Sequence, residues 1–241
     1  MNRKLLWIAG LVVVVVLAAY VGLSTFIGSA VRVGVNTVAP RLTQTRVVLD
    51  GASISPISGS GTLTGLSVGN PAGWSSNDAF RFEKIHVEVA PFSVLGDHIV
   101  VKDVEIDGAV FNYETEIVSS NIGDLLKTLE GQSAKDSAQA ASGGGRPMKI
   151  EIRRFRMQGG KVRLGTGDAA IIIPMPPIEL HDLGTGEGGA TPAVIALDVM
   201  RSVTESVIGA TARAAGKVGS TMGAAAGEAA KKAAEGLKSL F

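Results

Sequence analysis

Hydrophobic and polar positions divide the chain into three zones. Leu5–Ile27 is an apolar run of 23 residues without a charge. Residues 31–185 alternate between apolar and polar positions, whereas residues 192–241 show helical spacing and are rich in alanine and glycine. A period of two indicates half-buried strands and a period near 3.6 indicates helices. The pattern therefore predicts a membrane helix, a β-rich body and a C-terminal helix.

The middle zone contains one segment pattern twice. Ile99–Glu114 and Ile150–Gly165 match in their apolar positions, although hardly in identity. The positions Val101, Val104, Ile106, Phe111 and Tyr113 fall on Ile152, Phe155, Met157, Val162 and Leu164, and Gly108 falls on Gly159. Each copy is an alternating strand, a glycine turn and a second alternating strand. This order predicts two hairpin-like strand pairs.

Further elements are expected around these copies. The alternation of residues 80–92, with Ile85 and Val87 on one face, predicts one of about eight to ten strands. A juxtamembrane helix is expected to end at Pro40. Between the copies we expect a short helix, capped by Asn121 and stopped by Gly131, and then a flexible insert over residues 131–147.

The N-terminal run is long enough to cross a membrane. At 1.5 Å per residue it measures about 35 Å, against about 30 Å for the hydrocarbon core. A cleaved signal peptide has a shorter apolar region of about 7–15 residues, so an uncleaved anchor is favoured. Positive charges flank the run on both sides, and a large following domain translocates largely regardless of charge. We therefore expect a cytoplasmic N-terminus.

This organisation predicts three regions. Residues 1–30 form the tail and the transmembrane anchor, residues 31–185 form the β-rich body, and residues 186–241 form a glycine linker and an amphipathic helix. The helix carries an apolar stripe and an apolar end, which are candidates for contact with the sheet, a membrane or a partner: Leu197, Met200, Val203, Val207, Leu240 and Phe241. A bound helix and a frayed tail remain alternatives, because glycine makes an isolated helix marginal.

Composition and motifs argue against an enzyme. The chain has no cysteine, which excludes disulfides, thiolate zinc sites and a cysteine nucleophile. The net charge of +1 supplies no basic field for nucleic acid. Gly184–Gly189 matches a dinucleotide-binding glycine pattern, but no second parallel strand follows it. Asp103, Glu105 and Asp107 are assigned to a solvated strand face. We expect no catalytic residue, no metal and no cofactor.

Parts of the sequence resemble the N-terminal region of AsmA-like proteins. The resemblance covers residues 5–183 and is carried by the G-x-L-x-G-L-x-V-x-N-P-x-G run at Gly61–Gly73, by Ser93–Gly108 and by the helix that starts at Asn121. The family comprises bacterial inner-membrane proteins with one N-terminal span and a periplasmic β-rich body. It is related to TamB and to chorein-type bridge proteins, which carry lipids along an apolar groove.

The strand repeat and the resemblance together predict a mainly β fold with helices, in which an antiparallel sheet curls into a trough behind the N-terminal span. The long C-terminal helix, rich in alanine and glycine, is predicted from the residues alone. The resemblance implies a role in envelope lipid homeostasis or lipid transport, with acyl chains on the sheet. The lipid-facing candidates are Val101, Val104, Ile106, Phe111, Ile152, Phe155, Met157 and Val162. The alternative is a structural or adaptor protein that holds no lipid. The expected partners are the membrane, phospholipid, and a second protein or a second copy.

Overall fold

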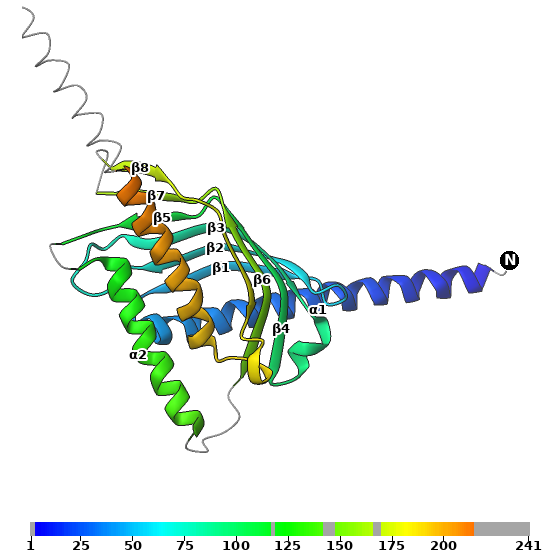
Figure 1. Cartoon of the computed structure of the whole chain (residues 1–241). Coiled ribbons are helices and arrows are strands. Elements are labelled where there is room, and N and C mark those ends of the chain that lie inside the picture. Colours follow the sequence, from blue (N-terminus) through cyan, green and yellow to red (C-terminus); the bar gives the residue numbers. More distant parts are fainter. Residues whose placement is uncertain (1–2, 117–118, 142–147, 166–169, 215–241) are drawn as a thin grey trace, which may run out of the picture.

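The computed structural model describes residues 3–116, 119–141, 148–165 and 170–214. Within them the fold is mixed α/β, with a nine-stranded sheet and three α-helices (Figure 1). The helices are α1 (Arg3–Thr43), α2 (Asn121–Ala141) and a C-terminal helix over 192–214. The strands are β1 (Val47–Ile54), β2 (Ser60–Gly69), β3 (Asp78–Val89), β4 (His98–Asp107), β5 (Val110–Tyr113), β6 (Lys149–Gln158), β7 (Lys161–Leu164), β8 (Ile171–Pro174) and β9 (Ile178–Leu183), with short 3-10 turns η1 (Pro91–Leu95) and η3 (Gly186–Gly188).

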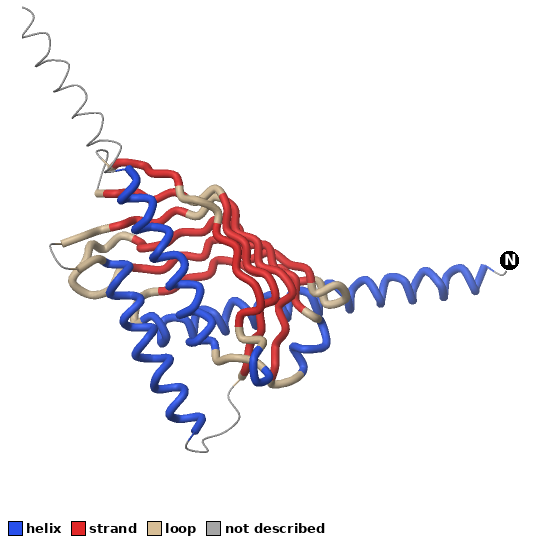
Figure 2. The backbone as a smooth tube through the Cα atoms, viewed as in Figure 1, coloured by secondary structure: helices blue, strands red, loops and turns tan. Residues whose placement is uncertain are grey.

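The two repeated segments form bent strands, so the prediction of hairpins is wrong. β1, β2 and β3 form an antiparallel meander, and the other edge of β3 pairs with both β4 and β5. β4 and β5 thus lie end to end along β3, and β6 and β7 lie end to end beside them. Gly108 and Gly159 adopt positive φ angles of 75° and 64°. Each glycine bends its strand, and the sheet bends with them (Figure 2).

The two copies pair with each other in parallel. Ile99 lies opposite Ile150 and Ile106 opposite Met157, so the register of the ladder equals the offset of the sequence repeat. β5 and β7 continue the same parallel register. The prediction of a purely antiparallel sheet is therefore wrong at its centre. A parallel pair requires a crossover connection, and α2 supplies it.

α2 and α1 both extend beyond their predicted ends, and the flexible insert predicted over residues 131–147 is wrong as far as Ala141, where α2 ends. α2 continues through Gly131 to Ala141, and its capping oxygen is the Ser120 hydroxyl, which accepts a hydrogen bond from Gly123 N–H at 3.1 Å. α1 is one continuous helix from the apolar run through Pro40 to Thr43, so the separate juxtamembrane helix is wrong. A proline this close to the helix end interrupts only the last turn.

The core lies between one face of the sheet and two helices. α2 and the C-terminal helix cross the same side of the sheet (Figures 1 and 2). Their buried apolar residues join those of the strands in one cluster: Ile122, Leu125, Leu129, Leu197, Met200, Val203, Val207 and Ala210. The expected start of the C-terminal helix is confirmed, since the Thr191 hydroxyl accepts a hydrogen bond from Val194 N–H at 3.4 Å. Its predicted extension beyond residue 214 lies outside the described residues.

Candidate functional site

Most of the candidate lipid-facing residues lie in the protein core. Ile106, Phe111, Phe155, Met157 and Val162 are all buried, with exposed fractions of at most 6%. Val104 and Ile152 are partly buried and pack against the same cluster, whereas Val101 is half-buried outside it. The structure therefore brings seven of the eight candidates together on the side that α2 and the C-terminal helix cover.

The candidate stripe on the C-terminal helix supplies the opposite wall of this interior. Leu197, Met200, Val203 and Val207 are buried, and Val207 is 0% exposed. Aromatic rings fill the β5 side, where Phe111 makes edge-to-face contacts with Phe80 at 5.3 Å and with Phe82 at 6.0 Å between ring centroids. The remaining two candidates, Leu240 and Phe241, lie outside the described residues.

A buried polar cluster ties the β2–β3 loop to the start of α2. Asn121 is fully buried, and its amide nitrogen donates to Asn70 Oδ1 and to the Asn112 carbonyl, each at 2.7 Å. Its side-chain oxygen accepts a hydrogen bond from Glu114 N–H at 3.0 Å. The Glu114 carboxylate in turn accepts from Asn70 Nδ2 at 2.9 Å and from the Ser75 hydroxyl. Buried polar atoms that are satisfied in this way fix one arrangement of the loop and the helix.

Trp74 extends this cluster along α2. Its indole N–H donates to Asp124 Oδ2 at 3.0 Å, and Lys127 contacts the other carboxylate oxygen at 3.1 Å. The hydrogen bond from Trp74, together with Lys127, lowers the pKa of Asp124 below its ordinary value. The two segments that carry the resemblance therefore contact each other through this hydrogen-bonded cluster, which joins Gly61–Gly73 to the helix that starts at Asn121.

The opposite face of the parallel pair carries complementary charges. Arg154 donates two hydrogen bonds to the Asp103 carboxylate, at 2.7 and 2.9 Å, and Arg156 pairs with Glu105. The Arg154 guanidinium lowers the pKa of Asp103, and the carboxylate raises the pKa of Arg154. The acidic side chains of Asp103 and Glu105 on β4 therefore form ion pairs with basic side chains of β6, and do not face solvent alone as predicted.

The junction between α1 and β1 was not predicted from the sequence. The Asn36 amide donates to the Leu49 carbonyl at 3.2 Å and accepts from Leu49 N–H at 2.7 Å, so it satisfies the free edge of β1 as a neighbouring strand would. Closer to the apolar run, the Ser24 hydroxyl donates to the Ile54 carbonyl at 3.2 Å. At Gly28 an added Cβ would lie 2.2 Å from the Ala52 carbonyl oxygen, so the helix and the strand approach too closely for a side chain.

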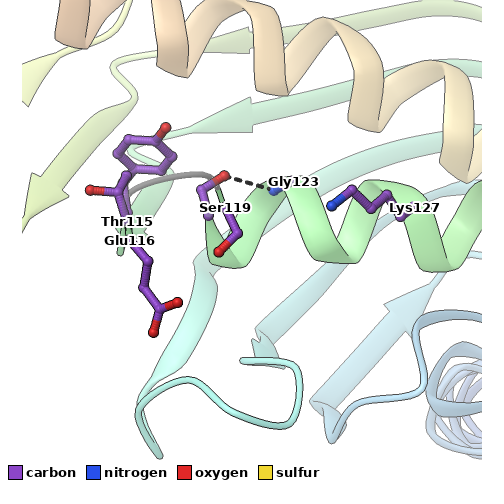
Figure 3. A pocket seen from close by; sticks show the side chains of 7 residues that line it. Thr115, Glu116, Ser119, Gly123 and Lys127 are labelled. Atoms are coloured by element: carbon purple, nitrogen blue, oxygen red, sulfur yellow. Dashed lines mark hydrogen bonds between the residues drawn. The ribbon is translucent and has the colours of Figure 1, made fainter.

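A shallow hollow of about 390 Å³ lies where α2 begins (Figure 3). It is lined by Tyr113, Thr115, Glu116, Ser119, Ser120, Gly123 and Lys127. The lining is mainly polar, which suits water or a small polar group rather than an acyl chain. Within the described ranges, no group of three or more histidine or acidic side chains is placed to hold a metal ion.

One helix of the described chain is long and apolar enough to span a membrane. It covers Leu11–Thr43, and its most apolar window of 18 residues has a mean hydropathy of 2.4 and is almost entirely exposed. Comparisons with protein-family models, with curated proteins and with solved structures found no match for this chain.

Proposed function

We propose that the chain is a single-pass, membrane-anchored, non-enzymatic adaptor of an envelope membrane complex. In this proposal α1 crosses the bacterial inner membrane with its N-terminus in the cytoplasm, and the β-rich body stands in the periplasm. The body binds partner proteins through its outer surface and holds no lipid inside. The AsmA-like resemblance supports the choice of compartment.

The observation that carries the proposal is the filled interior. The sheet face that would hold an acyl chain packs against α2 and the C-terminal helix, which leaves Met157 2% exposed and Phe111 1% exposed. An acyl chain on this face would have to displace Leu197, Met200 or Val203. Uncovering that much packed apolar surface costs several kcal/mol, at about 1.5–3 kcal/mol for each large side chain.

The junction of α1 with β1 gives the second line of support. The hydrogen bonds of Ser24 and Asn36 and the close approach at Gly28 fasten one continuous helix along the edge of the sheet. A body that is fixed to its anchor presents the same surface to the membrane plane at all times. This geometry suits an adaptor, because its partners bind a surface that is held in one orientation relative to the membrane.

Lipid transport is the second candidate, and one observation favours it. The C-terminal helix covers part of the apolar face and is joined to β9 only by the glycine-rich segment Gly184–Gly189. If this helix swings away, apolar residues of the sheet that belong to the shared core, such as Phe155 and Met157, lose part of their cover. An apolar trough on the sheet is what the resemblance to lipid-carrying proteins implies.

Photolabelling with a phospholipid that carries a photoactivatable group in its acyl chain distinguishes the two. The full-length protein is reconstituted with this lipid, irradiated and digested, and the labelled peptides are identified by mass spectrometry. The adaptor proposal expects labels on α1 between Leu5 and Phe26, which serve as the internal positive control. Labels on peptides that contain Met157 or Val203 would contradict it and support lipid transport.

A further inference from the structure

The β1–β2 turn and η1 lie at the end of the sheet that faces the N-terminal half of α1 (Figure 1), and both segments carry exposed apolar residues. Ile57 in the β1–β2 turn is 79% exposed, and Phe92 and Val94 in η1 are 87% and 47% exposed. Apolar residues scattered singly on a surface are ordinary, but a cluster of them indicates a binding surface. The interior core does not use any of these three side chains.

The two segments that carry these residues contact each other. Val89 N–H donates to the Gly59 carbonyl at 3.0 Å. Gly59 has a φ of 74°, and a Cβ there would lie 1.8 Å from the Val89 carbonyl oxygen and 3.2 Å from Pro91. The β1–β2 turn is therefore packed against the start of η1, which places Ile57 and Phe92 on adjoining segments.

The turn is also held at a defined level of α1. Tyr20 donates a hydrogen bond to the Ser55 hydroxyl at 3.3 Å, and Ser24 donates to the Ile54 carbonyl. At 1.5 Å per residue, the helix from Leu5 to Ser24 measures about 30 Å, which is the thickness of the hydrocarbon core. If the anchor begins after Lys4, its outer end coincides with the β1–β2 turn.

From this placement we propose that Ile57, Phe92 and Val94 insert into the headgroup region of the bilayer beside the anchor. The proposal rests on the anchoring of α1 and adds a second membrane contact to it. The occupant is the lipid bilayer, because the hydrogen bonds of Tyr20 and Ser24 hold the β1–β2 turn beside the outer end of the apolar helix. Together with α1, the two loops give three attachment points and fix the tilt of the body.

Site-specific fluorescence in nanodiscs tests the proposal. The chain has no cysteine, so single cysteines at Ile57, Phe92, Val14 and Ile171 can each carry an environment-sensitive dye in the full-length protein. Ile171 is the matched control: it is 61% exposed on β8, at the end of the sheet away from the N-terminal half of α1. The discs contain phosphatidylcholine with a nitroxide quencher on either a shallow or a deep acyl position.

We expect dyes at positions 57 and 92 to be blue-shifted and quenched severalfold more strongly by the shallow nitroxide than the dye at position 171. The dye at position 14 reports the anchor through the deep nitroxide. If the dye at position 14 is quenched but the dyes at positions 57 and 92 are quenched no more than the dye at position 171, the bilayer contact is overturned and the anchor stays intact. Loss of quenching at position 14 would contradict both the bilayer contact and the membrane anchor. A blue shift at 57 and 92 without quenching would show that protein covers this surface, which also overturns the proposal.

Discussion

Val207 and Ile208 offer a direct test of whether the C-terminal helix is a permanent part of the core. They are neighbours on the helix, yet Val207 is 0% exposed and Ile208 is 50% exposed. We compare Val207→Ala with Ile208→Ala. Both changes replace a β-branched residue by alanine, so both gain the same small helix propensity, about 0.5 kcal/mol.

The expected destabilisation differs because the burial differs. Val207→Ala removes two buried carbon groups at about 0.8 kcal/mol each, and the cavity left behind adds to this loss. After the gain in helix propensity, we expect a net loss of about 2 kcal/mol. Ile208→Ala removes three groups that are half in water, so we expect a net loss of about 0.5 kcal/mol.

Urea unfolding of the full-length protein in a mild detergent measures both values. The chain has two tryptophans, and Trp7 lies in the apolar run. In a Trp7→Phe background, tryptophan fluorescence reports only Trp74, whose indole N–H donates a hydrogen bond to Asp124 of α2. The two variants are compared by the difference between their losses in the free energy of unfolding. Equal losses below about 0.5 kcal/mol would refute the reasoning, because a helix that leaves the sheet easily gains nothing from Val207.

Three further results are expected from other parts of the structure. Gly28→Val should cost about 1–3 kcal/mol by forcing a Cβ against the Ala52 carbonyl, whereas Gly22→Val, which has open space, should be tolerated in the same urea assay. Asn36→Leu should leave the Leu49 amide unpaired and raise its hydrogen-exchange rate severalfold, whereas Thr37→Val, an exposed change one residue away, should not. The pKa of Asp103 is lower in the folded than in the unfolded chain, so its contribution is present above about pH 4 and is lost as the pH falls through the folded pKa; Asp103→Asn should abolish this part of the acid dependence of stability.

The elements that the sequence predicted best are those in which local pattern and burial agree. In β3 the alternation places Ile85 and Val87 in the core, as their period of two indicates. Helix ends were predicted less well, because tertiary contacts override local breakers. α2 passes Gly131 and buries Ser133 on the next turn, and α1 passes Pro40 while Ala39 and Leu42 pack on the core.

Glycine and asparagine patterns proved ambiguous for physical reasons. A glycine with positive φ fits either a turn or a bend within a strand, and at Gly108 only the pairing with β3 distinguishes the two. Asn36 looks like any polar residue on the outer face of an amphipathic helix. Its pairing with Leu49 depends on the path that the chain takes after Thr43, which no local pattern encodes.

The charged positions of the repeat, and not only its apolar positions, indicate how the two copies pair. Alternation assigns a residue to a face of the sheet but does not choose its neighbour on the adjacent strand. Ion pairs supply this choice: Asp103 meets Arg154 and Glu105 meets Arg156, and both pairs are separated by 51 residues. That separation is also the register of the parallel ladder between β4 and β6. Since a slip by one residue would break both ion pairs and turn Met157 out of the core, the same offset fixes the charged face and the apolar face together.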